Sequence, residues 1–302
     1  MSYAVLFSGQ GTQHPGMLPW LEAEPACQSA LAALQSAGGA DWRGALADDS
    51  QRSSNAFAQP LIVCTGLAAW SALAAHLTEG PTAVAGYSVG ELSAYACAGV
   101  FSHEVAITLA RQRAACMDAA VQGLETGLLS VSGWPMEAVL QTCPGLDCAI
   151  HIGADQGIYA GTTALLDASA TTLTGQGALC KRLDVRVASH SHWMARAAEQ
   201  FAGQLRDLPF ARPSAPLACN ATGTTGRQPD ALRQALSDQI ARTVRWAACM
   251  ESIAEQGVAC VIEVGAGTAL SKMWNQQHPT IPARSIEEFR DAAGAARWIA
   301  RM

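Results

Sequence analysis

The residues best suited to chemistry are Gly86-Tyr87-Ser88-Val89-Gly90, which have the spacing of a nucleophile elbow. The apolar run 82–86 predicts a short buried strand before them, and residues 91–99 predict a helix after them. A sharp turn between the two would hold the Ser88 hydroxyl clear of the sheet, and the glycines would allow close backbone approach. The helix N-terminus adds positive potential, and the Val89 amide would point to where an oxyanion forms. The pattern predicts a serine nucleophile, although a glycine-rich chain also contains this spacing by chance.

A serine nucleophile needs a base, and the chain has seven histidines. Two of them, His190 and His192, lie where the segment 126–187 would rejoin the rest of the chain. Catalytic residues favour loops at such junctions. Spacing alone does not choose between these two histidines, and surface histidines at the start of a helix would give the same pattern.

An arginine lies on the apolar face of the helix predicted from Ser102 to about residue 121. At about 100° per residue, Val105, Leu109 and Arg113 share one side of this helix, whereas Arg111 points the opposite way. A guanidinium on an apolar face needs an anionic partner, and it matches a carboxylate with two parallel hydrogen bonds. The position of Arg113 fits two interpretations: binding of a substrate carboxylate, or a structural ion pair with an internal Asp or Glu.

Short apolar strands alternate with helices along the chain, which predicts an α/β architecture around a parallel sheet. Strands are predicted at 3–7, 82–86, 216–220 and 259–264, and helices at 25–35, 57–77, 102–121, 191–208, 229–243 and from Ser285, where Glu288 completes a capping box. Residues 126–187 instead predict the order βαββαβ of a ferredoxin-like unit, with a last strand at 178–187. We expect a large subdomain of residues 1–125 and 188–302, interrupted by a small subdomain of residues 126–187.

The composition describes a globular protein with a substantial core. Of the 302 residues, 50% are hydrophobic and 15% charged, with a net charge of −6, which excludes disordered and collagen-like chains. The absence of basic runs argues against nucleic acid as a partner. The first basic residue is Arg43, so no secretory or mitochondrial signal is expected, and the apolar run 61–75 is too short and interrupted to span a membrane. Ten dispersed cysteines predict buried thiols in a reducing cytoplasm, with no metal site.

Taken together, these residues resemble the malonyl-CoA:acyl carrier protein transacylases, a family that includes the acyltransferase domains of polyketide and fatty acid synthases. The similarity runs from end to end in the family's order, through the segments FSGQGTQHPGM, GYSVGELSAYACAGVFS, RQRAACM, VASH, CNATG, TVRW and VIEVGAGTALSKM. It implies an α/β-hydrolase-like large subdomain with an inserted ferredoxin-like (βαββαβ) small subdomain.

The resemblance also implies a reaction. Ser88 would accept the acyl group, His190 rather than His192 would be its general base, and Arg113 would bind the free carboxylate of malonyl. Malonyl would pass from malonyl-CoA to Ser88 and then to the prosthetic-group thiol of an acyl carrier protein, in a ping-pong sequence. No cofactor is implied beyond the substrate and the phosphopantetheine-type arm of the carrier, and the enzyme would be a cytoplasmic monomer.

Further roles follow from the same resemblance. The backbone amides of Gln10 and Val89 would form the oxyanion hole, and the backbone carbonyl of Arg245, within the V-x-W segment, would orient the histidine. The acidic chain must attract an anionic thioester and a carrier through local basic groups. The candidates for contact with coenzyme A or the carrier are Lys181, Arg182, Arg186 and Asn220, with Arg242 and Arg245 as further basic candidates.

Several departures from the family pattern bear on the acceptor. Ser8 stands where proline is usual, Tyr87 where histidine is common and Arg245 where glutamine is common, and residues 151–155 replace an Asn-rich stretch. With the compact C-terminus, these features resemble the dedicated transacylase of malonate decarboxylase systems, which loads that system's own carrier.

Other interpretations keep the same catalytic set. They are a transacylase of fatty acid synthesis and a polyketide acyltransferase, for which the VASH segment leaves methylmalonyl open. From another reaction class, a serine thioesterase or hydrolase would use the same groups, although such enzymes place an Asp or Glu between serine and histidine in chain order. A scaffold that has lost activity is the non-catalytic alternative.

Overall fold

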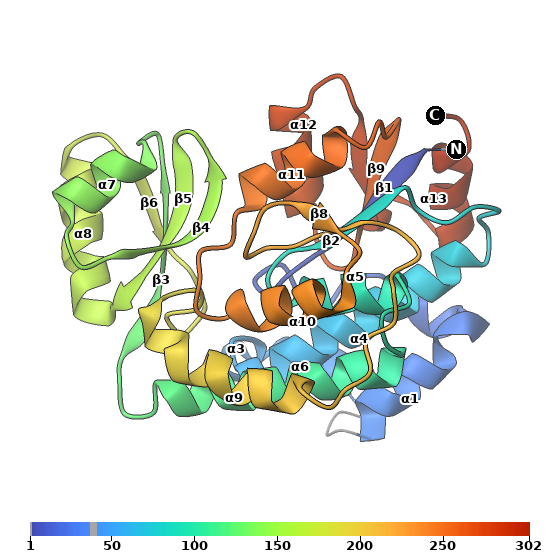
Figure 1. The fold of residues 1–302 in the computed structure, drawn as a ribbon, viewed down its shortest axis with the longest axis horizontal. Helices are drawn as coiled ribbons and strands as arrows, with labels where there is room; N and C mark the ends of the chain where they lie inside the picture. The colour runs from blue at the N-terminus through green and yellow to red at the C-terminus, as the bar shows by residue number, and fades with distance from the viewer. Residues whose placement is uncertain (1, 37–40) are drawn as a thin grey trace.

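A computed structural model describes residues 2–36 and 41–302, which form two sheets covered by helices (Figure 1). The larger sheet has the order β10-β9-β1-β2-β7-β8. Its strands are β1 (Tyr3–Phe7), β2 (Ala83–Gly86), β7 (Leu217–Ala218), β8 (Thr225–Gly226), β9 (Cys260–Val264) and β10 (Ala283–Ser285). All neighbouring pairs are parallel except β7 and β8, which form an antiparallel pair.

The central strands are buried on both faces, which is why they read as continuous apolar runs rather than alternating ones. Side chains still alternate between the faces: Tyr3, Val5 and Phe7 enter one core, whereas Ala4 and Leu6 enter the other. The first core is covered by α1 (Gln28–Ser36), α4 (Asn55–Ala74), α5 (Gly90–Cys97), α6 (His103–Ala120), α9 (Ala195–Leu205), α10 (Pro229–Asp238) and α13 (Ala292–Ile299). The second lies beneath α11 (Trp246–Ala254) and α12 (Ala269–Gln277).

The smaller sheet is antiparallel throughout and has the order β4-β5-β3-β6. Its elements are β3 (Thr126–Ser132), α7 (Met136–Thr142), β4 (Asp147–Gly153), β5 (Gln156–Thr162), α8 (Thr163–Gly175) and β6 (Leu179–Arg182). This strand order with βαββαβ connectivity is the ferredoxin-like arrangement. Figure 1 shows this sheet and its two helices standing to one side of the larger sheet.

The two sheets are joined through packing and backbone hydrogen bonds. Leu128, Ile150 and Ile158, on the face of the small sheet opposite α7 and α8, belong to the second core of the large subdomain. Strand β4 also pairs with the segment after α10: the Val244 amide donates to the Ala149 carbonyl, and the His151 amide donates to the Val244 carbonyl, both at 2.9 Å. The catalytic segments described below lie along this junction.

The expected α/β fold with an inserted ferredoxin-like sheet is confirmed, and the differences are local. The last predicted strand ends at Arg182 instead of residue 187, because Leu183 and Val185 turn toward a pocket between the sheets. The capping box of Ser285 and Glu288 is present, but it caps the three-residue 3-10 turn Ile286–Glu288. The last helix begins only at Ala292, after extended backbone at Phe289, and Asp291 caps it.

Helix α4 is long and apolar enough to cross a membrane by length and composition, but most of it is buried inside the fold, as in the core helix of a soluble protein. All ten cysteines are free thiols, and each is buried or partly buried. The remaining helical turns are α2 (Trp42–Ala45), α3 (Asp49–Arg52), η1 (Leu21–Ala23), η2 (Pro25–Cys27), η3 (His192–Met194) and η4 (Ile286–Glu288).

Candidate active site

Ser88 lies on the sharp turn between β2 and α5. Its φ is +55°, a left-handed conformation that is costly for a residue other than glycine and that often marks active sites. The flanking glycines are required by close backbone contacts: a Cβ on Gly86 would lie 2.0 Å from the Gly90 carbonyl oxygen, and one on Gly90 would lie 2.5 Å from that of Phe7. The predicted nucleophile elbow therefore has the tight geometry that its sequence requires.

His190 meets the Ser88 hydroxyl directly, with Nε2 at 2.8 Å from Oγ. Its other ring nitrogen, Nδ1, lies 2.5 Å from the carbonyl oxygen of Gln239, and its amide donates to the Ile240 carbonyl at 2.9 Å. Because a carbonyl oxygen only accepts, Nδ1 carries the proton and Nε2 presents a lone pair to the hydroxyl. This arrangement can take a proton from Ser88.

The electrostatic surroundings keep His190 neutral. Burial and, second to it, the positive charge of Arg113 lower the pKa of His190, the hydrogen bond to the Gln239 carbonyl acts in the opposite direction, and together they give a pKa of about 3. An imidazole with a lowered pKa holds no proton on Nε2 at neutral pH, which is the state that a base needs.

His192, the other candidate base, does not contact Ser88, and the residue predicted to orient His190 is not the one that the structure shows. His192 points to the small subdomain, where its Nδ1 lies 2.6 Å from the Asp147 carboxylate, and its side chain is 64% exposed. The prediction that Arg245 orients the imidazole is wrong. The Arg245 carbonyl accepts the Cys249 amide at 2.9 Å in the first turn of α11, whereas the carbonyl that lies against His190 Nδ1 is that of Gln239, in the backbone that follows α10.

Arg113 reaches the same hydroxyl from α6. It is 1% exposed, and its Nη2 lies 3.3 Å from Ser88 Oγ. Its other partners are neutral amides: Nη1 donates to Oε1 of Gln59 at 2.8 Å and Nη2 to Oε1 of Gln239 at 3.2 Å. In the part of the chain that the structure describes, no carboxylate lies within hydrogen-bond distance of this guanidinium. The structural ion pair considered above is therefore not the arrangement found.

The acidic group that acts electrostatically on Arg113 is Glu91, which follows the elbow and is fully buried. Burial raises the pKa of Glu91 to about 8, whereas the pKa of Arg113 is lowered by burial only to about 10. Burial thus favours the neutral form of the Glu91 carboxyl, whereas the guanidinium stays charged at neutral pH, so Arg113 carries a positive charge with no carboxylate of the described residues bonded to it.

Asn220 stabilises the elbow through hydrogen bonds to its backbone. Its Oδ1 accepts the Ser88 amide at 2.9 Å, its Nδ2 donates to the Gly86 carbonyl at 2.7 Å, and its own amide donates to Glu91 Oε1 at 2.8 Å. The expectation that Asn220 contacts a carrier or coenzyme A is wrong, because the residue is fully buried and its side chain is committed to the elbow. These hydrogen bonds hold the strained turn in place.

The backbone amides of Gln10 and Val89 are the donors predicted to form the oxyanion hole. Val89 is the N-cap of α5, so its amide belongs to the donors that a helix leaves unsatisfied. Among residues 2–36 and 41–302, neither amide has a hydrogen-bond acceptor. Gln10 also lines the catalytic pocket with Ser88 and His190. Two such donors can stabilise an oxyanion.

The catalytic pocket has a volume of 50 Å³ and lies between the large subdomain and the open face of the small sheet. One side is polar and includes Gln59 and Arg113. The other side is apolar and is formed by Leu128, Ile150, Ile158, Leu183 and Val185. Gln59, Glu91 and Gln239 were not predicted from the sequence. Of the three, Gln59 is marked by a sequence signal, because it is a polar residue within an apolar helix.

Three of the basic candidates lie on β6 and the segment after it, whereas Arg242 and Arg245 are exposed between α10 and α11. Lys181 and Arg186 are exposed, whereas Arg182 is partly buried, forms an ion pair with Asp167 at 3.2 Å and donates to the Thr163 carbonyl. The segment continues into Leu183 and Val185 of the pocket wall.

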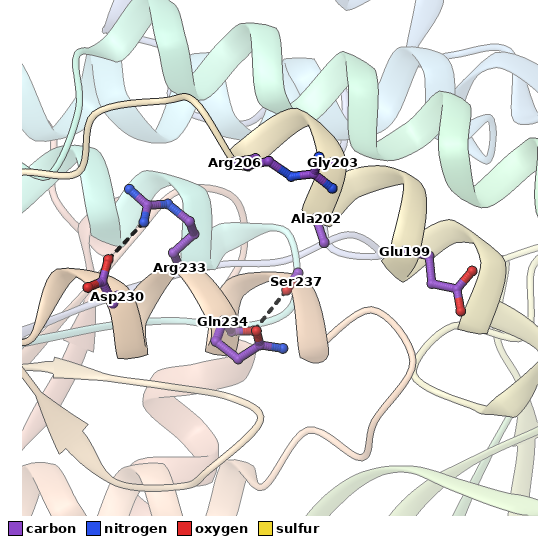
Figure 2. A pocket seen from close by; sticks show the side chains of 8 residues that line it. All are labelled: Glu199, Ala202, Gly203, Arg206, Asp230, Arg233, Gln234 and Ser237. Atoms are coloured by element: carbon purple, nitrogen blue, oxygen red, sulfur yellow. Dashed lines mark hydrogen bonds and ion pairs between the residues drawn. The ribbon is translucent and has the colours of Figure 1, made fainter.

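A separate groove of 370 Å³ lies between α9 and α10 (Figure 2). Charged side chains of both signs line it: Glu199 and Arg206 from the α9 side, and Asp230 and Arg233 from α10. Arg233 forms an ion pair with Asp230 at 2.9 Å. The groove contains neither Ser88 nor His190, so it is distinct from the catalytic pocket.

Comparison with known proteins places the whole chain beside one group of enzymes. Residues 5–297 match the family model of the acyl transferase domain. The malonyl CoA-acyl carrier protein transacylase of Mycobacterium bovis is 33% identical, over 95% of this chain and 97% of that protein. Among solved structures, FabD from Acinetobacter baumannii is 27% identical with a TM-score of 0.90, and the match covers 99% of this chain and 98% of that one. A malonyl-transacylase in complex with its type II PKS acyl-carrier protein has the same identity and TM-score, over 98% of this chain and 99% of that one.

Proposed function

Since the chain belongs to the acyl transferase domain family and is an acyltransferase, we propose that it moves malonyl from malonyl-CoA to the thiol of an acyl carrier protein. The observation that carries the proposal is the position of Arg113. A buried guanidinium whose partners are neutral amides lies 3.3 Å from the hydroxyl of a serine–histidine pair. That geometry supports an acyl group with a free carboxylate.

In the first half-reaction, Ser88 Oγ attacks the thioester carbonyl of malonyl-CoA while His190 Nε2 takes the hydroxyl proton. The oxyanion of the tetrahedral intermediate is stabilised by the Gln10 and Val89 amides. The intermediate collapses with cleavage of the carbon–sulfur bond, and the proton on His190 passes to the departing thiolate. The products are malonyl-Ser88 and coenzyme A.

The second half-reaction reverses these steps with another thiol. The carrier's thiol gives its proton to His190, and the resulting sulfur nucleophile attacks malonyl-Ser88. Collapse breaks the ester bond, and His190 returns the proton to Ser88 Oγ. Hydrogen bonding of Nδ1 to the Gln239 carbonyl stabilises the imidazolium at both stages.

Arg113 gives the reaction its selectivity for the acyl group. The malonyl carboxylate would pair with the guanidinium, which carries its charge at neutral pH and contacts Gln59 and Gln239. An acetyl group would leave this charge desolvated and unpaired, at a cost of about 1–3 kcal/mol.

The same proposal includes the partner of the enzyme and its location in the cell. The enzyme acts on a carrier, as the relative solved with its acyl-carrier protein does. Exposed Lys181 and Arg186, with the neighbouring Arg182, would contact the anionic partners. We place the protein in the cytoplasm as a monomer that needs no cofactor, and the burial of the long apolar helix α4 supports a soluble enzyme.

The proposal also concerns which carrier protein accepts the malonyl group. The relatives named above are malonyl CoA-acyl carrier protein transacylases, which supports a carrier of fatty acid or polyketide synthesis. The dedicated carrier of a malonate decarboxylase is the alternative acceptor, favoured by the departures at Ser8, Tyr87 and Arg245. Offering both carriers side by side in one transfer assay decides between them, because the true acceptor is malonylated faster at equal concentration.

The test of the general proposal uses malonyl-CoA without a carrier. We expect one equivalent of enzyme-bound malonyl on Ser88, detected by mass spectrometry, and none in Ser88→Ala. Rapid multiple turnover to free malonate would instead establish a thioesterase. Failure of Ser88 to become malonylated would favour a scaffold without activity.

A further inference from the structure

Tyr87 lines the catalytic pocket, and its hydroxyl takes no part in the reaction described above. Its side chain lines the pocket and is 9% exposed, and its hydroxyl is buried without a hydrogen-bond partner among residues 2–36 and 41–302. Native proteins keep few such groups, because a buried polar atom without a partner lowers stability. The Tyr87 side chain thus forms part of the pocket wall, and its hydroxyl is a hydrogen-bond donor for which the described residues supply no acceptor.

The alternation of β2 fixes which side of the pocket Tyr87 occupies. Ala83 and Ala85 enter the second core, beneath the small sheet, and Tyr87 continues this series. Arg113 comes from α6, whose buried side chains enter the first core on the opposite face. Ser88 lies on the turn between the two and contacts Arg113.

This separation divides a bound thioester into two parts. With the malonyl carboxylate at Arg113, the rest of the molecule must leave Ser88 on the other side. That side is the one formed by Tyr87 and the apolar residues Leu128, Ile150 and Ile158. Tyr87 therefore faces the thiol arm rather than the acyl group.

The surroundings of Tyr87 fix its ring and add a second donor. The ring packs edge-on against Trp246, with centroids 5.1 Å apart, and a Cβ on Gly9 would lie 3.0 Å from its Cδ1. Beside Gly9, Nε2 of Gln10 is also buried and without a partner. An apolar wall with isolated donors suits a chain in which methylene groups alternate with amides.

We propose that Tyr87 Oη donates a hydrogen bond to an amide carbonyl oxygen of the thiol arm, so that Tyr87 selects amide-bearing thioesters. The inference rests on the proposed function, since it concerns the arm that coenzyme A and the carrier's prosthetic group share. It assigns Tyr87 a binding role in addition to its place in the elbow.

The experiment compares two malonyl donors in the acylation of Ser88 by Tyr87→Phe. One is malonyl-N-acetylcysteamine, which carries an amide near sulfur, and the other is malonyl propyl thioester, which carries none. We expect the substitution to lower kcat/KM about tenfold for the amide donor, the change that one ordinary hydrogen bond gives, and less than about twofold for the propyl donor. The melting temperature should be unchanged or higher, because the variant removes a buried hydroxyl without a protein partner.

Tyr159→Phe is the matched control. The Tyr159 hydroxyl is likewise buried and without a partner, but it belongs to the core between the small sheet and its helices, outside the pocket. This variant should keep the wild-type preference between the two donors. If Tyr87→Phe lowers kcat/KM equally for both donors, or for neither, the proposed role of Tyr87 is wrong and the proposed function is unaffected. Absence of malonylation of the wild type by either donor overturns the proposed function as well.

Discussion

The carbonyl oxygen of Gln239 lies 2.5 Å from Nδ1 of His190, so main chain rather than a carboxylate orients the imidazole of this site. A carbonyl carries no net charge, and it therefore raises the pKa of His190 less than burial and Arg113 lower it. The histidine stays neutral and oriented without an acidic partner. This arrangement also explains how the chain dispenses with the Asp or Glu that a hydrolase places between serine and histidine.

Replacing His190 and His192 one at a time should show which of them is the general base. His190→Ala removes the only imidazole that contacts Ser88 in the described part of the chain, and we expect malonylation of Ser88 to slow by about 10²–10⁴-fold. His192→Ala removes an exposed ion pair with Asp147 and should change the rate only a few-fold. Single-turnover mass spectrometry measures both. The reverse order of effects would assign the base to His192.

Removal of the guanidinium should change the choice of acyl group. In Arg113→Ala we expect kcat/KM for malonyl-CoA to fall by about 10–150-fold, the range for a charge-assisted hydrogen bond, while acetyl-CoA is used as well as before or better. Arg111→Ala, on the exposed side of the same helix, is the control and should leave the malonyl-to-acetyl ratio unchanged. Equal losses for both thioesters would mean that Arg113 is merely structural.

Glu91 should make stability depend on pH. Its pKa is raised from 4.5 to about 8 by burial, so between these values the folded state binds more protons than the unfolded state. The free energy of unfolding must therefore fall as pH rises through this window, by at most a few kcal/mol. Glu91→Gln keeps an oxygen for the Asn220 amide and cannot ionise, so its stability should fall less over the same range.

Urea titrations at several pH values measure this difference. Exposed Glu137→Gln, on α7, should retain the wild-type profile. Identical profiles for wild type and Glu91→Gln would show that the carboxyl of Glu91 does not change protonation in this window.

Two glycine substitutions should have opposite effects. A Cβ on Gly90 would lie 2.5 Å from the carbonyl oxygen of Phe7 and 2.6 Å from that of Ser8, and neither backbone atom can move without displacing the sheet. We expect Gly90→Ala to lose at least about 1–3 kcal/mol of stability and most of its activity.

Gly203→Ala is the counterpart, because a Cβ on this exposed position of α9 would meet nothing within 4 Å. It should gain about 0.5–1 kcal/mol, since alanine orders more readily than glycine within a helix. Thermal denaturation compares the two variants. A stable and active Gly90→Ala would contradict the tight packing of the elbow.

The sequence by itself determined the features that depend on neighbouring residues. The elbow at Ser88 is encoded by an apolar strand, two glycines and a helix, all within a short segment. Arg113 on the buried side of α6, and the βαββαβ order of the inserted unit, follow from periodicities of 3.6 and 2. These patterns are local, so they can be recognised without knowing the rest of the fold.

Only the tertiary structure decided how distant segments meet at Ser88. It brought His190 rather than His192 to the hydroxyl, and the carbonyl of Gln239 rather than that of Arg245 to the imidazole. It also placed Asn220, expected to contact coenzyme A or a carrier, in a buried position where its side chain holds the elbow. The physical reason is that a carbonyl 49 residues from its histidine reaches the ring only through the packing of α10 against the loop after the small sheet. No periodicity within one segment encodes that distance.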